Sequence, residues 1–173
     1  YLEQEGKEAY LEDVRILQRY AEWNRQIIVR EILKGMKWKA KEQFSAAHNY
    51  LDETGMLRKG CISAQKGERV IIPANMKEGI LLGVGRGSRE WNCSAPHGSG
   101  RRLKREEVKK QYTVSAFKKE MKGIFSTCVG AETLDEAPFA YRSISEIAEQ
   151  IKDTVEITER LVSVYNYKAG SRR

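Results

Sequence analysis

A helical repeat of apolar residues spans residues 8–38 and constrains the fold more than any other feature of this sequence. Apolar positions recur at spacings of three and four, as on one face of an α-helix, while charged residues fill the other face. Asn24 interrupts the apolar stripe, so we expect its amide to bond another buried group or a ligand. The stripe consists of Tyr10, Val14, Leu17, Ala21, Asn24, Ile28 and Ile32.

The character of the sequence changes after a connector at residues 40–56. Two short apolar runs, at residues 70–73 and 80–84, enclose a polar turn and predict two buried strands. Residues 85–102 contain Gly85, Gly87, Gly98 and Gly100, with Gly83 just before them, and predict a loop with a permissive backbone.

Two helical segments and a strand are predicted in the remainder of the chain. Residues 104–123 are charged and helical, with a break near Tyr112 and Ser115 as the candidate cap of the second half. Residues 144–152 predict a short helix capped by Ser143 or Ser145, and residues 155–167 predict a strand. Because helices and short strands alternate without a β-α-β rhythm, the pattern favours an α+β fold.

The bulk composition narrows the class of protein. The chain has 173 residues, 40% hydrophobic and 32% charged, which is typical of a globular domain and not of a disordered or membrane protein. It begins at Tyr1 within a helical pattern, so we expect a piece of a longer polypeptide. The net charge of +7 favours polyanionic partners. Three dispersed cysteines, Cys61, Cys93 and Cys128, favour a reducing cytoplasm.

The segment around His97 carries the strongest chemical signal. Pro96 stiffens the approach to the histidine, and Gly98 and Gly100 let backbone amides come close to a bulky group. Such amides can cradle phosphate oxygens, and the guanidinium of Arg101 can bind them as a fork. A neutral imidazole beside this cradle could attack phosphorus. Taken alone, the pattern also fits a surface loop with an incidental histidine.

The amino-acid sequence of this segment resembles the signature of the RtcB-type tRNA-splicing and RNA-repair ligases. In that family the histidine of the signature becomes guanylylated. The resemblance continues in collinear order over nearly the whole chain. The matching segments are Tyr20-Ala21-Glu22-Trp23-Asn24-Arg25, His48-Asn49, Arg58-Lys59-Gly60, Val70-Ile71-Ile72-Pro73, Ser94-Ala95-Pro96-His97-Gly98-Ser99-Gly100-Arg101, Asp135-Glu136-Ala137-Pro138, Tyr141 and Tyr165-Asn166-Tyr167-Lys168-Ala169-Gly170.

The resemblance implies a GTP- and manganese-dependent RNA ligase. Such enzymes join RNA 3′-phosphate or 2′,3′-cyclic phosphate ends to 5′-hydroxyl ends through a histidine-guanylate. The chain would be the C-terminal portion, residues 1–173, of a larger single catalytic domain with an RtcB-like ligase fold. Its partners would be RNA, the N-terminal half of the same protein and an activating protein such as archease.

Carried over by position, the resemblance implies a role for twelve residues. His97 would be the nucleophile, His48 a manganese ligand, Tyr141 a stacking partner for guanine, and Lys168 a contact to the base. The residues implied to bind the nucleotide are Asn75, Glu78, His97, Gly98, Gly100, Arg101, Tyr141 and Lys168, and those implied to bind RNA or phosphate are Arg25, Arg58 and Lys59.

One departure from the family pattern limits these expectations. The family's two-metal centre also needs an Asp, a Cys and further His residues, whereas this chain has two His, both already assigned. We therefore expect the isolated chain to form no histidine-guanylate. The alternatives are a non-catalytic RNA- or nucleotide-binding remnant of the same fold, another nucleotidyl-transfer or nucleotide-hydrolysing enzyme, and a basic structural protein.

Overall fold

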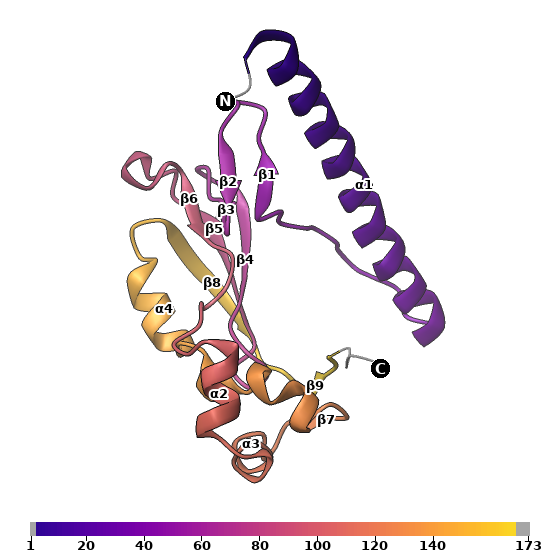
Figure 1. Ribbon diagram of the computed structural model, residues 1–173, viewed down its shortest axis with the longest axis vertical. Coiled ribbons are helices and arrows are strands. Elements are labelled where there is room, and N and C mark those ends of the chain that lie inside the picture. Colours follow the sequence, from indigo (N-terminus) through magenta and orange to yellow (C-terminus); the bar gives the residue numbers. More distant parts are fainter. Residues whose placement is uncertain (1–2, 169–173) are drawn as a thin grey trace. The chain divides into compact units, whose positions relative to one another are not determined.

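A computed structural model describes residues 3–168 as two compact units, residues up to 59 and residues from 60 onward. Ala169 and Gly170 of the closing motif lie outside the described residues. The elements mix helices with short, mostly antiparallel strands (Figure 1), which confirms the predicted α+β class. Within the described residues, no helix is long and apolar enough to cross a membrane.

The first unit consists of a long helix and a short hairpin. Helix α1 (Gln4–Met36) confirms the predicted helix, although it begins earlier and ends at a left-handed Lys37. None of its residues is buried, and Asn24 is exposed, so the expected burial of the apolar stripe is not observed. Strands β1 (Asn49–Leu51) and β2 (Leu57–Lys59) pair antiparallel, within and just beyond the predicted connector.

The hairpin of the first unit is fixed by polar contacts. The carboxylate of Asp52 accepts hydrogen bonds from the backbone and hydroxyl of Thr54 and from the backbone of Met56. The hydroxyl of Thr54 is the largest cause that lowers the pKa of Asp52. The side chain of Gln18, on α1, donates to and accepts from the backbone of Leu51 and so holds the helix against β1.

The second unit is built on the sheet that the apolar runs predicted. Strands β4 (Arg69–Pro73) and β5 (Ile80–Gly85) pair antiparallel across the expected polar turn, and β8 (Val155–Leu161) adds to the other side of β5 (Figure 1). Val70 and Ile72 of β4 are buried in alternation, as a strand with one covered face requires.

Two further strand pairs complete the second unit. Strand β3 (Cys61–Ser63) pairs antiparallel with β6 (Ser94–Pro96). Strand β6 lies within residues 85–102, which were predicted to form a loop. A one-turn helix η1 (Arg89–Trp91) precedes β6. Strand β7 (Phe125–Ser126) pairs in parallel with β9 (Tyr165–Asn166), so the predicted strand at residues 155–167 is divided into β8 and β9.

Short helices contribute to an apolar cluster in this unit. They are α2 (Arg105–Gln111), α3 (Val114–Glu120), η2 (Ala131–Glu136) and η3 (Pro138–Ala140). Helix α4 (Ile144–Gln150) follows them in the chain and buries Ile144 and Ile147. The predicted break between α2 and α3 is confirmed. The core of the cluster consists of Met76, Val108, Phe117, Met121, Leu134, Ala137 and Ala140.

Caps were predicted for two helices, α3 and α4, and the structure agrees with the prediction only for α4. The hydroxyl of Ser143 accepts a hydrogen bond from Glu146 N and caps α4, so of the two predicted candidates Ser143 is the cap and Ser145 is not. Ser115 was the wrong choice for α3, because Thr113 holds that position and accepts from Ala116 N at 3.2 Å. The cap belongs to the last residue with an extended backbone, and Ser115 already lies inside the helix.

Candidate functional site

A cavity of about 870 Å³ in the second unit collects most of the predicted nucleotide-binding residues. The turn between β4 and β5 forms one wall, the loop at residues 97–101 a second, and the chain from Leu161 to Lys168 a third. The predicted residues that line this cavity are Asn75, His97, Gly98, Gly100, Arg101, Tyr141 and Lys168. Its volume lies in the range of small-molecule sites.

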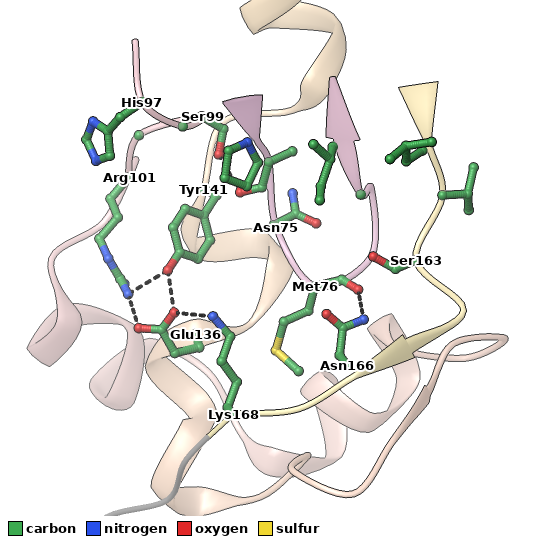
Figure 2. A pocket seen from close by; sticks show the side chains of 18 of the residues that line it. Asn75, Met76, His97, Ser99, Arg101, Glu136, Tyr141, Ser163, Asn166 and Lys168 are labelled. Atoms are coloured by element: carbon green, nitrogen blue, oxygen red, sulfur yellow. Dashed lines mark hydrogen bonds and ion pairs between the residues drawn. The ribbon is translucent and has the colours of Figure 1, made fainter. Parts of the chain in front are cut away.

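His97 follows directly after β6, at the edge of this cavity (Figure 2). Its Nδ1 lies 2.5 Å from the carbonyl oxygen of Gly60. Because that oxygen can only accept, Nδ1 must carry the proton of this hydrogen bond. In the neutral ring Nε2 then holds the nucleophilic lone pair.

Ser99 anchors the loop that carries His97. Its side chain is almost fully buried, its hydroxyl donates to the carbonyl of Ala74 at 2.8 Å, and its backbone N–H donates to the carbonyl of Pro73 at 3.2 Å. These contacts tie the loop to the turn after β4, which places His97 relative to the cavity wall. A hydrogen bond of this kind contributes about 1 kcal/mol.

A polar network lies on the floor of the cavity (Figure 2). The guanidinium of Arg101 donates to Glu136 at 2.6 Å and to the hydroxyl of Tyr141 at 2.8 Å. That hydroxyl donates to the other oxygen of Glu136 at 2.6 Å, and the ammonium of Lys168 reaches the same oxygen at 3.3 Å. Arg105 adds a further bond to Glu136, at 2.5 Å.

The network shifts two pKa values in opposite directions. Burial raises the pKa of Glu136, but the hydrogen bonds from Tyr141 and Arg105 and the charges of Lys168 and Arg101 outweigh it and lower the pKa to about 2. Burial and the hydrogen bond to Glu136 raise the pKa of Tyr141 to about 12. At neutral pH the carboxylate is therefore ionised and the phenol protonated.

The charges that line the cavity favour an anionic ligand. Three cationic side chains, those of Arg101, Arg105 and Lys168, face one carboxylate, that of Glu136. The guanidinium carbon of Arg101 also lies 4.6 Å from the centroid of the Tyr141 ring, so it covers one face of that ring. A planar base that stacks on Tyr141 would therefore use the other face.

Asn75 and Glu78 are engaged within the turn between β4 and β5. The side-chain oxygen of Asn75 accepts from the backbone of Lys77 and Glu78, and its nitrogen donates to Glu78 at 2.6 Å. The carboxylate of Glu78 also accepts from Ile144 N at 3.2 Å, at the start of α4. Both side chains thus shape the turn, and Glu78 is not among the described residues that line the cavity.

The other predicted site residues belong to the first unit. His48 and Lys59 are exposed, and Arg25 is partly buried on α1. Arg58 is only 1% exposed and pairs with Asp52 at 3.2 Å, so its guanidinium holds the hairpin and is not presented to solvent. Among residues 3–168, no three His, Cys, Asp or Glu side chains converge in a metal site.

Sequence reasoning assigned no role to three residues that shape the site: Gly60, Arg105 and Glu136. Glu136 lies in a segment that carried the family resemblance, and Arg105 follows Arg101 by four residues, so both could have been suspected. The contact of Gly60 with His97 joins residues 37 positions apart. No local pattern signals such a contact.

Comparison with known proteins places the chain in a family. The family model described as "tRNA-splicing ligase RtcB" matches residues 1–169. The RNA-splicing ligase RtcB of Escherichia coli K12 is 30% identical in an alignment of 173 positions that covers 90% of this chain and 42% of the relative. The tRNA-splicing ligase RtcB of Aeropyrum pernix is 35% identical over 88 residues, which are 48% of this chain and 18% of that relative.

The matches cover most of this chain but less than half of the relatives. The chain spans about two fifths of the length of the Escherichia coli relatives. The matched region includes both described units and every residue that lines the cavity. The chain therefore belongs to the RtcB family of tRNA-splicing ligases.

Proposed function

We propose that this chain carries the guanylate-accepting part of a GTP-dependent RNA ligase. The full-length protein would join RNA 3′-phosphate or 2′,3′-cyclic phosphate ends to 5′-hydroxyl ends, in tRNA splicing or RNA repair. The observation that carries the proposal is the position of His97, whose Nδ1 bonds Gly60 at the edge of a cavity lined by three cationic side chains. A nucleotide with several phosphates fits that charge.

The proposed reaction has three bond exchanges. His97 Nε2 attacks the α-phosphorus of GTP, an N–P bond forms, and the bond to the leaving pyrophosphate breaks. An oxygen of the RNA 3′-phosphate then attacks the same phosphorus and displaces His97. Finally the 5′-hydroxyl loses its proton and attacks the phosphorus of the activated 3′-phosphate, which releases GMP. A cyclic phosphate end must first be opened by water.

The cavity suggests how the guanylate would be held. The guanine would stack on the face of Tyr141 that Arg101 leaves uncovered, with Lys168 at the edge of the base. The backbone of Gly98 and Gly100, together with Arg101, would surround the phosphates. Because Arg101 already bonds Glu136 and Tyr141, a phosphate would share this guanidinium with the network.

Manganese ions would offset the negative charge of the phosphates that come together at this site. His48 is the residue of this chain that we propose as a ligand, since imidazole suits such metals. The described residues do not make a complete metal site by themselves. We propose that the remaining ligands come from the part of the protein outside this chain.

The proposal also names a substrate, an activating protein and the cytoplasm as the compartment. The substrate is an RNA with the two end chemistries named above, and an activating protein of the archease type is a candidate partner in the cytoplasm. The competing proposal is a non-catalytic RNA- or nucleotide-binding module with the same fold. It would bind guanine nucleotide without forming a covalent adduct.

The decisive experiment follows label from GTP into the protein. The full-length protein is incubated with manganese and GTP labelled at the α-phosphate, and protein-bound label is measured on a denaturing gel. We expect acid-labile label that is absent from His97→Ala and absent with labelled ATP. Absence of label from a folded, metal-loaded protein would favour the binding module, and label from ATP would favour another nucleotidyl-transfer enzyme. The isolated 173-residue chain should take up no label.

A further inference from the structure

A second cavity, of about 580 Å³, borders the same loop that carries His97. Residues 97–100 line both cavities, so this loop is the shared wall between them. The rest of the lining comes from the chain at Gly60, from Trp91 at the end of helix η1, from strand β6, from Arg142 and from helix α4 with the residues that follow it. None of the roles proposed above uses this space.

The backbone at residues 141 and 142 assigns one side chain to each cavity. Tyr141 has an extended conformation, with φ −114° and ψ 161°, and forms a β-bridge with Arg101. Successive side chains of an extended chain point to opposite faces. Tyr141 accordingly lines the first cavity, and Arg142 lines the second.

The guanidinium of Arg142 lies directly against the loop of His97. A Cβ at Gly100, which has φ +68°, would come within 2.9 Å of Arg142 Nη1, so a side chain here would displace the guanidinium. Arg142 is exposed, and its guanidinium makes no hydrogen bond or ion pair with another residue of the described chain. In contrast, Arg101 and Arg105 are both bonded to Glu136. Arg142 therefore offers a complete fork of donors to an anion.

An aromatic side chain lines the same cavity. Trp91 is 57% exposed, and the rest of the lining is largely apolar, with Ala95, Pro96 and Ile147 among its members. An indole face next to an apolar wall is suited to stacking an unpaired base. The cavity thus combines one phosphate-binding group and one base-stacking group.

The geometry points to the second cavity as the subsite for the 3′-terminal nucleotide of the RNA. Arg142 binds the terminal 3′-phosphate, and Trp91 stacks on its base. The ligand class is a nucleoside 3′-phosphate at the end of a strand. This inference rests on the proposed function, because it assigns the acceptor of the guanylate to the side of the loop opposite the nucleotide.

The test measures binding of RNA ends without turnover. Short fluorescent RNAs that differ only in a 3′-phosphate or a 3′-hydroxyl are titrated by anisotropy into the full-length protein at fixed salt, without GTP. We expect wild type to prefer the phosphate end, and Arg142→Gln to lose that preference, by roughly tenfold, while it still binds the hydroxyl end. Trp91→Ala should weaken both RNAs equally, since stacking does not read the phosphate.

The matched control is Arg86→Gln, which removes an exposed arginine that lines neither cavity and should keep the preference for the phosphate end. A preserved preference in Arg142→Gln, or no preference in wild type, would overturn the subsite. So would unchanged RNA binding in both cavity variants, which would indicate that another part of the longer protein fills this space. Histidine-guanylate formation in the same preparations is scored separately, so failure of the proposed function is distinguishable from failure of the subsite.

Discussion

The hydroxyl of Tyr141 donates a hydrogen bond of 2.6 Å to Glu136, and Glu136 in turn holds the cations that line the first cavity. This pair joins the segment at residues 136–141 to the loop of His97 through Arg101. The carboxylate is the common partner of every charged group that lines the cavity. The position of Arg101 and Lys168 therefore depends on a residue that need not touch a ligand in the cavity.

Glu136→Gln should destabilise the full-length protein by on the order of 2 kcal/mol at neutral pH and reduce histidine-guanylate formation. The folded-state pKa of about 2 lies below the ordinary value of 4.5, so the stabilisation is complete above about pH 4.5. It is lost as the pH falls from there toward 2. Urea unfolding of wild type and variant between pH 7 and 3.5 measures the difference, which should shrink as the pH falls.

The control for this prediction is Glu132→Gln, which changes an exposed carboxylate in the same short helix. It should leave both stability and guanylate formation close to wild type. A stability difference between wild type and Glu136→Gln that stays constant over this pH range would contradict the ionic role of Glu136.

The hydrogen bond from His97 to Gly60 predicts which ring nitrogen would carry the proposed guanylate. Nδ1 donates at 2.5 Å to the Gly60 carbonyl, so Nε2 is the nitrogen with the lone pair. Nitrogen and phosphorus NMR of the guanylylated full-length protein should show the phosphoramidate at Nε2. A bond at Nδ1 would require the contact with Gly60 to break, and would refute this assignment.

The sequence predicted the elements whose signals are local. The long helix, the paired strands around residues 74–79 and the cap at Ser143 each follow from spacing or turn chemistry within a few residues. Strand β6 was missed because its three residues lie in a glycine-rich stretch, and its partner β3 is some thirty positions away. A strand this short is specified by its partner and not by its own composition.

The residues of the candidate site also fall into two groups: those that share a local motif, and those that are defined by contacts between distant parts of the sequence. His97 and Arg101 were singled out because they share one short motif, and both line the same cavity. The roles of Glu136 and Gly60 arise from contacts across 35 and 37 positions, which a single sequence does not display. Arg58 was expected to contact RNA or phosphate because its segment resembles that of the family, whereas its 1% exposure depends on packing around the hairpin.

Helix α3 provides a direct comparison of two hydroxyl residues. Thr113→Ala should destabilise the protein by about 1 kcal/mol, because Ala116 N then loses its acceptor. Ser115→Ala should be neutral or slightly stabilising, since Ser115 is exposed inside the helix and alanine has the higher helix propensity. Urea midpoints of the two variants measure the difference. Equal effects would mean that Thr113 does not act as the cap.

The turn that forms one wall of the cavity depends on the absence of a side chain at Gly79. A Cβ there would lie 1.9 Å from the carbonyl oxygen of Leu161, and the residue has φ +89°. Gly79→Ala should therefore lose the pairing of β5 with the end of β8, at a cost of about 3 kcal/mol or more.

Gly55→Ala is the matched control, because Gly55 has φ +83° and open space around it. It should cost only the backbone strain, about 1 kcal/mol. Thermal unfolding of both variants separates the two contributions, and equal losses would show that strain alone, and not the contact with Leu161, requires glycine in this turn.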